Sequence, residues 1–154
     1  MKIAIASDHA GFELKKYLIN YIEELGLEVQ DFGPLLYTED DDYPDYVKSV
    51  GEYISENNNP EDFRGIVIGG SGQGENICAN RYDNVRSVIV YGNDMNLNTN
   101  IVKLSRQHND ANIISFGARF ITNENASELL KIWLEEKFSN EERHVRRLSK
   151  IENK

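Results

Sequence analysis

The sequence predicts an α/β fold: a three-layer α/β/α sandwich in which a five-stranded parallel sheet lies between helices. Three observations lead to this prediction. The chain has 154 residues, close to the roughly 150 typical of one domain, so a single domain over residues 1–154 is expected. Short apolar segments alternate with segments of helical periodicity. The apolar segments are hydrophobic at nearly every position, as in strands that helices cover on both faces.

The first half of the chain supplies three predicted strands. Residues 2–6 form an apolar run, and the next segment has apolar residues every three or four positions until Gly26, a residue type that commonly ends helices. The apolar pattern of residues 27–32 predicts a second strand, and Pro44 suits the first turn of the next helix. A third strand is predicted at residues 64–69, directly before a glycine-rich loop.

The second half continues the alternation with two more strands, at residues 85–90 and 111–116. Helices are predicted after the glycine-rich loop, near residues 95–107, and around Trp133, where leucines recur at helical spacing. A charged C-terminal helix is predicted at about residues 140–153. These elements together predict a Rossmann-like sandwich.

The charge and the apolar runs exclude two classes of partner. A net charge of −9 at pH 7 argues against binding to nucleic acid, because proteins that bind its phosphate backbone normally carry a basic surface. Apolar stretches reach only about six residues, against the roughly 20 that a membrane-spanning helix needs. The N-terminus also lacks the apolar core of a signal peptide. We therefore expect a cytoplasmic protein without nucleic-acid or membrane partners.

Disulfide and metal chemistry are not indicated either. Cys78 is the chain's one cysteine, so no internal disulfide can form. The histidines, His9, His108 and His144, lack the spacing of a metal motif such as HExxH. Residues 39–42 form an acidic run that could hold a cation, but a solvated loop is the more common role of such a run. We expect no metal site.

Polar and flexible residues follow three of the predicted strands. Ser7-Asp8-His9 follows the first strand, the glycine-rich loop follows the third, and Gly117-Ala118-Arg119 follows the fifth. In an open parallel sheet, ligands bind at the carboxyl ends of the strands, where these loops converge. We therefore expect the functional site at this edge of the sheet.

The glycine-rich loop, Gly69 to Gly74, follows an apolar strand and opens a helix. Its N–H groups could stabilise an oxyanion or a phosphate, although a tight strand-to-helix turn would need similar glycines. Three common motifs do not match the loop. Glu75 stands where the dinucleotide fingerprint needs its third glycine, and the Gly-Lys-Ser/Thr ending of a P-loop is missing. Gln73 replaces the last glycine of a G-x-S-x-G nucleophile elbow.

Glu75, at the start of the helix after this loop, is a candidate general base. Its carboxylate could remove a proton alpha to a carbonyl, while the loop N–H groups stabilise the resulting enediolate. The helix dipole should keep Glu75 ionised, which predicts a low pKa and a weak base, so enediolate stabilisation would supply most of the rate. The carboxylate could instead serve only to complement the dipole.

Basic residues gather near the C-terminus of this acidic chain. Arg143 and Arg147 are four positions apart and share one helix face, where two guanidinium groups could clamp a phosphate. Arg119 could add a third guanidinium, and His108 could move protons near pH 7. A charge-decorated helix and a hydrogen-bonded structural histidine are the alternative interpretations.

Short motifs run nearly from end to end of the chain: Ser7-Asp8-His9-Ala10-Gly11, Asp31-Phe32-Gly33, Asp42-Tyr43-Pro44-Asp45, the GGSGQGE loop, His108-Asn109-Asp110-Ala111, Gly117-Ala118-Arg119 and Arg143-His144-x-Arg146-Arg147. Together they resemble the type B ribose-5-phosphate isomerases and the related galactose-6-phosphate isomerase subunits. The resemblance implies a cofactor-independent aldose-ketose isomerase of the pentose phosphate pathway. Such an enzyme interconverts D-ribose 5-phosphate and D-ribulose 5-phosphate through an enediolate. The resemblance also implies a homodimer or a dimer of dimers with shared active sites, in which the C-terminal helix contacts the partner.

The resemblance implies a role for each matching residue. Glu75 would be the base, and His108 and Asp8 would help to open the sugar ring. The residues that stabilise the enediolate and line the loop side of the pocket would be Gly70, Ser71, Gly72, Gln73 and Gly74. The other contacts to the sugar phosphate would come from Asp8, His9, Tyr43 and Asn109, and from Arg119, Arg143 and Arg147 at the phosphate. His108 and the C-terminal arginines would reach the site from the neighbouring subunit.

One departure from the family pattern concerns the base. Many members carry a cysteine at the position of Gly69, whereas this chain resembles the subgroup in which the glutamate of GGSGxGE replaces it. Cys78 is then expected to belong to the core. The resemblance to this subgroup implies a preference for the five-carbon sugar phosphate. Two alternatives stay open: an isomerase of galactose 6-phosphate or allose 6-phosphate, and a non-catalytic module that binds a sugar phosphate or a nucleotide.

Overall fold

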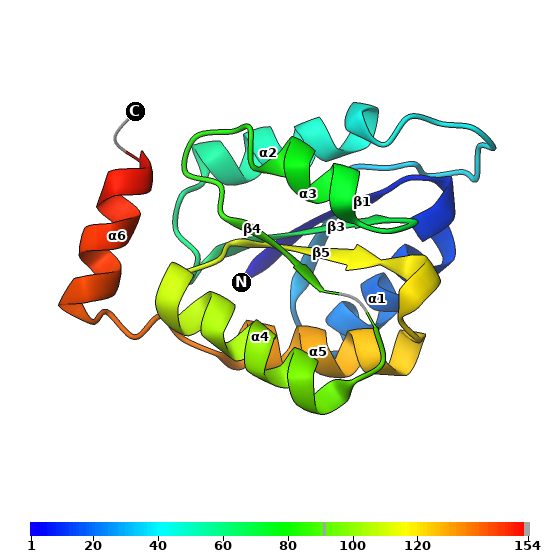
Figure 1. Cartoon of the computed structure of the whole chain (residues 1–154). Coiled ribbons are helices and arrows are strands. Elements are labelled where there is room, and N and C mark those ends of the chain that lie inside the picture. Colours follow the sequence, from blue (N-terminus) through cyan, green and yellow to red (C-terminus); the bar gives the residue numbers. More distant parts are fainter. Residues whose placement is uncertain (91, 153–154) are drawn as a thin grey trace.

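The computed structural model describes residues 1–90 and 92–152 and confirms the predicted order of elements (Figure 1). The strands are β1 (Lys2–Ser7), β2 (Glu28–Asp31), β3 (Phe63–Gly69), β4 (Ser87–Val90) and β5 (Ile113–Gly117). The α-helices are α1 (Phe12–Glu24), α2 (Pro44–Glu56), α3 (Gln73–Ala79), α4 (Met95–Asn109), α5 (Asn123–Glu135) and α6 (Glu142–Glu152). Two single turns of 3-10 helix, η1 (His9–Gly11) and η2 (Ala118–Phe120), follow β1 and β5.

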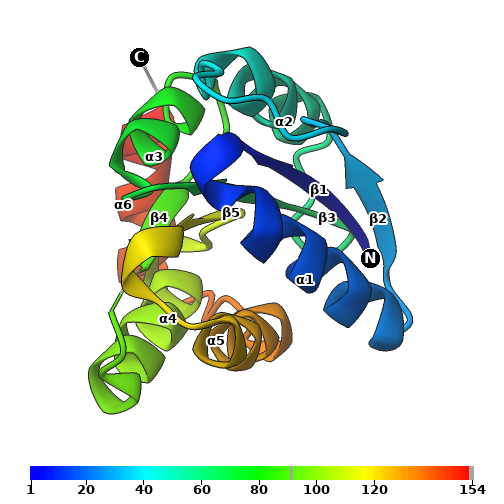
Figure 2. The same ribbon diagram turned by 90° about the vertical axis from the view of Figure 1, so that its right-hand side faces the viewer.

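The five strands of the described chain are all parallel and lie in the order β2-β1-β3-β5-β4. Helices α2 and α3 cover one face of the sheet, and α1, α4 and α5 cover the other (Figures 1 and 2). This is the predicted three-layer sandwich, with helices where right-handed crossovers between parallel strands place them. The chain runs outward from β1 to β2 and then returns past β1 to β3. The strand order therefore reverses between β1 and β3, which is where sheets of this kind bind ligands.

The two faces of the sheet carry different buried side chains. Larger residues such as Ile66 and Phe116 pack with Trp133 beneath α1, α4 and α5. Smaller residues such as Ala4 and Ala6 lie beneath α2 and α3. Because helices cover both faces, the strands are apolar without alternation, which is the pattern that predicted them.

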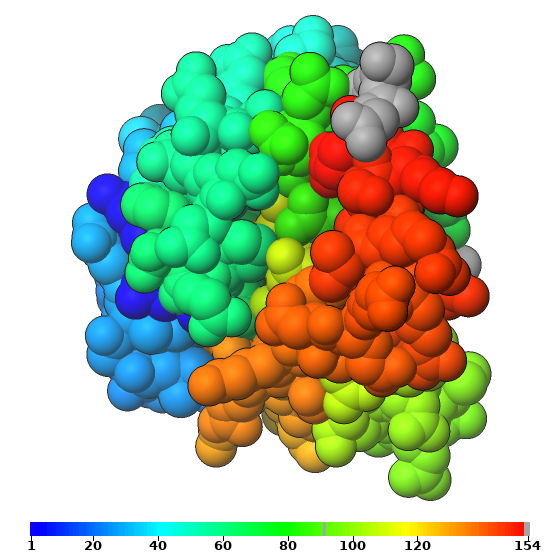
Figure 3. All heavy atoms as spheres, turned by 90° about the vertical axis from the view of Figure 1, so that its left-hand side faces the viewer, coloured from blue at the N-terminus to red at the C-terminus, as the bar shows by residue number. Residues whose placement is uncertain are grey.

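Helix α6 is set apart from the sandwich, at the end of the molecule where the strands begin (Figure 1). The glycine-rich loop lies at the opposite end, where β3 finishes. Figure 3 faces the α6 end and shows this helix, in red, spread over the surface. Among its described residues, His144 is the buried one. No helix of the described chain is long and apolar enough to span a bilayer.

Candidate active site

The glycine-rich loop makes a tight connection between β3 and α3. Gly72 has a φ of +74°, a left-handed conformation that strongly favours glycine. The Ser115 hydroxyl donates a 2.8 Å hydrogen bond to the Gly72 carbonyl, and a Cβ on Gly72 would lie 2.9 Å from the Phe116 backbone. The turn requirement therefore accounts for Gly72. Ser71 and Gln73 lie exposed on the loop, and the Gln73 N–H donates to the Ser71 hydroxyl oxygen at 3.3 Å.

Glu75 lies in the first turn of α3 with only 4% of its surface exposed. Burial raises the pKa of its carboxyl group, the Asp8 carboxylate raises it further, and a backbone hydrogen bond only partly opposes this. The predicted low pKa is therefore wrong, because the sequence indicated the helix dipole but not the depth of burial. A higher pKa makes the Glu75 carboxylate a stronger base than expected.

Gly69 and Glu75 depend on each other. A Cβ placed on Gly69 would overlap the Glu75 carboxylate, with Cδ and both oxygens among its nearest atoms. Any larger residue at position 69 would therefore displace the carboxylate. The site therefore has room for a side chain at position 69 or for the Glu75 carboxylate in its present place, but not for both. Cys78 lies half-buried against the core beneath α2 and α3, as expected, and burial raises the pKa of its thiol.

Asp8 and His9 follow β1 and turn toward the same end of the sheet. Asp8 is 8% exposed, and its carboxylate accepts a 3.0 Å hydrogen bond from the Gly11 N–H. The Asp8 N–H donates to the Ile68 carbonyl at 3.2 Å, which ties this loop to β3. The Asp8 carboxylate is thus held by the backbone, close enough to Glu75 to influence its pKa.

His9 has a partner that sequence reasoning missed. Its Nδ1 lies 2.8 Å from Oδ1 of Asp41, and its backbone N–H donates to the same oxygen at 2.8 Å. The hydrogen bond to Asp41 raises the pKa of the His9 imidazole, and the charges of Asp8 and Asp40 add to this. Asp41 belongs to the acidic run predicted to be a solvated loop, but its side chain is only 6% exposed, so the prediction is wrong at this position. The position of Asp41 just before the Asp42-Tyr43-Pro44 motif was the one available signal.

Tyr43 and Arg119 lie directly against the glycine-rich loop. A Cβ on Gly74 would come within 2.6 Å of the Tyr43 ring, and a Cβ on Gly70 would come within 3.1 Å of the Arg119 guanidinium. The backbone N–H of Arg119 also donates to the Gly70 carbonyl at 3.1 Å. These two glycines allow an aromatic ring and a guanidinium group to approach the loop backbone.

The remaining predicted residues lie at the other end of the sheet. His108 and Asn109 occupy the last turn of α4, and Arg143 and Arg147 lie exposed on α6 (Figure 1). The His108 ring stacks on His144 with ring centroids 4.2 Å apart, and burial with the nearby charges of His108 and Arg143 lowers the pKa of His144. Arg143 pairs through Nε with Glu141 at 2.8 Å. One chain therefore brings the first group of residues together and keeps this second group away from it.

Neither group forms a metal site within residues 1–90 and 92–152, where no three His, Cys, Asp or Glu side chains are placed to hold an ion. The first group instead offers a buried base, backbone N–H donors at the start of a helix, and one guanidinium. That combination suits proton transfer next to a carbonyl, with stabilisation of the negative oxygen that results.

Comparison with known proteins gives a consistent result. A family model described as Ribose/Galactose Isomerase matches residues 3–151. A ribose-5-phosphate isomerase B from Mycolicibacterium paratuberculosis is 34% identical over 149 residues, covering 96% of this chain and 87% of the relative. The crystal structure of ribose-5-phosphate isomerase B from Mycoplasma genitalium with bound ribulose-5-phosphate superposes with a TM-score of 0.89 at 32% identity, covering 98% and 93% of the two chains. The corresponding protein from Thermotoga maritima gives a TM-score of 0.87 at 39% identity, covering 99% and 98%. This chain therefore belongs to the ribose/galactose isomerase family.

Proposed function

We propose that this protein is an isomerase that interconverts D-ribose 5-phosphate and D-ribulose 5-phosphate without a cofactor. The observation that carries the proposal is the buried Glu75 carboxylate, held in the first turn of the helix that the glycine-rich loop opens. Relatives named ribose-5-phosphate isomerase B, one of them with ribulose-5-phosphate bound, support this substrate class.

In this proposal Glu75 carries the proton between the two reacting carbons. The carboxylate removes the proton from C2 of the open-chain aldose, and the C–H electron pair forms the C1–C2 double bond of an enediolate. The N–H groups of Gly70 to Gly74, together with Ser71, stabilise the negative oxygen. Protonated Glu75 then returns the proton to C1, and the hydroxyl proton of O2 passes to O1. The raised pKa of Glu75 favours the first step.

The other residues of this end bind and orient the sugar. Asp8 contacts the sugar and takes part in ring opening, while His9 and Tyr43 line the pocket and Arg119 binds the phosphate. Holding the phosphate fixes C1 and C2 against the base, so that binding at a remote group lowers the barrier at the reacting atoms.

His108, Asn109, Arg143 and Arg147 complete the site from a second copy of this chain, in a homodimer or a dimer of dimers. Their distance from Glu75 within one chain supports this part of the proposal (Figure 1). An exposed apolar stripe on α4 supports it too, because Leu97, Ile101 and Leu104 are spaced by four and three residues and so share one helix face. In the second copy, His108 assists ring opening, Asn109 binds the sugar, and the arginines bind the phosphate.

A cytoplasmic role in the pentose phosphate pathway belongs to the same proposal. Sugar phosphates are charged and do not enter a bilayer without help, so an enzyme that consumes them works where they are made.

Proton NMR of ribose 5-phosphate with the purified protein in D₂O tests the proposal. We expect ribulose 5-phosphate to form and deuterium to enter the sugar at the reacting carbon. If deuterium entered galactose 6-phosphate or allose 6-phosphate but not ribose 5-phosphate, the substrate would be a hexose 6-phosphate instead. If these sugar phosphates bound tightly but showed no deuterium exchange, the protein would be a non-catalytic binding module and not an enzyme.

A further inference from the structure

Helix α6 lies over hollows rather than over a close-packed surface. A groove of about 330 Å³ is lined by Pro60 and Phe138 on the body and by Val145 and Leu148 on α6. A second groove, of about 350 Å³, separates Leu148 and Ile151 from the start of β4. The two grooves interrupt the packing between α6 and the body, so other contacts also contribute to its position.

Two attachments fix α6, a ring stack near its start and a set of polar contacts near its end. In its first turn, His144 stacks on His108 at 4.2 Å. In its last turn, Oε1 of Glu152 pairs with Nη1 of Arg86 at 2.9 Å, and Oε2 accepts the Asn84 N–H at 3.2 Å. Arg86 is thus the anchor for the far end of the helix.

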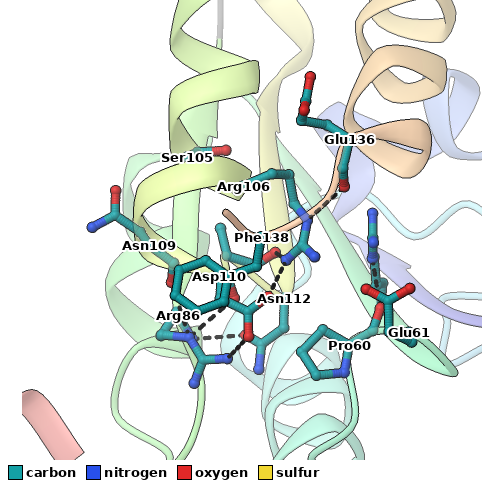
Figure 4. Close-up of polar contacts among 12 residues, drawn as sticks. Pro60, Glu61, Arg86, Ser105, Arg106, Asn109, Asp110, Asn112, Glu136 and Phe138 are labelled. Carbon is teal, nitrogen blue, oxygen red and sulfur yellow. Dashed lines mark hydrogen bonds and ion pairs between the residues drawn. The ribbon is translucent and has the colours of Figure 1, made fainter. Parts of the chain in front are cut away.

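The same guanidinium holds the end of α4. Nε of Arg86 donates to the carbonyls of Asn109 at 3.1 Å and Asp110 at 3.0 Å, and Nη2 pairs with Oδ2 of Asp110 at 3.1 Å. Asp110 has a φ of +45°, and Arg106 donates to its other oxygen at 2.8 Å, so two arginines meet at this turn (Figure 4). The Arg86 backbone is itself fixed, because its N–H donates to the Asn112 side chain at 2.8 Å.

We propose that Arg86 is a positioning residue that sets the His108–Asn109 turn and helix α6 in one arrangement, so that both reach the neighbouring active site together. This inference rests on the proposed function. The Arg86 side chain is 13% exposed, and the proposed function gives it no contact with the substrate or with the reacting atoms. Its planar fork reaches acceptors on three segments at once, because Nη1 also donates to the Asn84 carbonyl at 3.3 Å. The point charge of a lysine cannot do this.

The test compares Glu152→Gln, which weakens only the α6 attachment, with Arg86→Gln, which weakens both. Glu152→Gln should raise KM for ribose 5-phosphate about threefold at nearly unchanged kcat, because α6 carries Arg143 and Arg147. The inhibition constant of inorganic phosphate should rise in parallel. Arg86→Gln should also lower kcat, for a loss in kcat/KM of about tenfold or more, because the ring-opening histidine shifts as well. Arg86→Lys should recover only part of this loss.

Glu135→Gln is the matched control, since it removes a carboxylate that pairs with Lys131 at 4.0 Å in an exposed i,i+4 pair on α5. It should leave KM and phosphate inhibition unchanged. If Arg86→Gln does not fold, the kinetics of Glu152→Gln alone test the inference. This variant should fold, because the Glu152 side chain is 31% exposed and lies outside the core. With an active wild type, wild-type KM and phosphate inhibition in Glu152→Gln would overturn this inference and leave the proposed function standing. If the wild-type protein fails to convert ribose 5-phosphate, both the proposed function and the inference about Arg86 are rejected.

Discussion

The two ends of the sheet hold their proposed functional groups in different ways. At the carboxyl end, Glu75 and Asp8 are 4% and 8% exposed and are fixed by strand ends and loop backbone. At the amino end, the Arg143 side chain is 55% exposed, and α6 is held by a ring stack and an ion pair. Burial changes the proton affinity of a carboxylate, whereas an exposed guanidinium stays charged and ready for an incoming anion. This difference agrees with the proposed roles, in which Glu75 at the first end transfers the proton and the exposed Arg143 and Arg147 at the second end help to bind the phosphate.

Glu75→Gln should give the largest effect at the buried end. We expect kcat to fall by about 10⁴-fold, because an amide cannot accept the C2 proton, with little change in the sugar-phosphate Kd measured by calorimetry. Glu13→Gln is the matched control, since it removes an exposed carboxylate from the first turn of α1 and should keep full activity. Near-normal turnover in Glu75→Gln would reject the assignment of the base.

Combining two inactive variants in one dimer tests whether each active site takes Glu75 from one chain and the C-terminal arginines from the other. Glu75→Gln and the double variant Arg143→Ala/Arg147→Ala should each be nearly inactive at low substrate concentration. After co-expression in equal amounts, about half of the dimers should contain both chains, with one intact site each, which restores about a quarter of wild-type activity. If a purified mixed dimer recovered no activity, Glu75 and the arginines of each site would have to come from the same chain, and the shared site would be rejected.

Arg143→Ala should have a smaller effect and one of a different kind. KM should rise about tenfold while kcat stays within about twofold, because the phosphate is bound equally in the ground state and the transition state. Arg81→Ala, which removes an exposed arginine after α3, should leave both constants unchanged. Steady-state kinetics measure both constants. An unchanged KM in Arg143→Ala would show that Arg143 does not bind the phosphate.

The pH profile of kcat/KM should reveal the environment of Glu75. The ionised carboxylate is the base, so activity is present above its pKa and is lost as pH falls through that value. Because burial and Asp8 raise the pKa of Glu75, the acid limb should lie at higher pH than an ordinary glutamate gives. Asp8→Asn removes one of these causes and should move the acid limb of the profile to lower pH. Asp62→Asn, which changes an exposed residue before β3, is the control and should leave the acid limb in place. A limb that stays in place in Asp8→Asn would contradict the coupling of the two carboxylates.

Much of the fold could be predicted from the sequence, because burial on both faces leaves a continuous apolar run in each strand. The second strand was predicted at residues 27–32 and spans Glu28–Asp31, a difference confined to its ends. The insertion of β5 between β3 and β4 could not be predicted. Periodicity reports which faces of a strand are buried but not which strand lies beside it.

The site was predictable to the extent that it follows strand ends. Asp8, the glycine-rich loop and Arg119 follow β1, β3 and β5, and the rule for open parallel sheets placed them together. Asp41 was missed because a charge run looks the same whether one of its members is exposed or hydrogen-bonded. The pKa of Glu75 was predicted in the wrong direction because depth of burial is a property of the folded chain.

The contact between Gly69 and Glu75 constrains how this site can change in evolution. Since the two positions compete for one volume, the effect of a substitution at either depends on the residue at the other, and their effects do not add. A cysteine at position 69 fits only if the Glu75 carboxylate moves or its side chain is shortened. Single-substitution routes between a glutamate site and a cysteine site therefore pass through a chain with a displaced base or with none. Positions 69 and 75 are therefore expected to change together rather than one at a time.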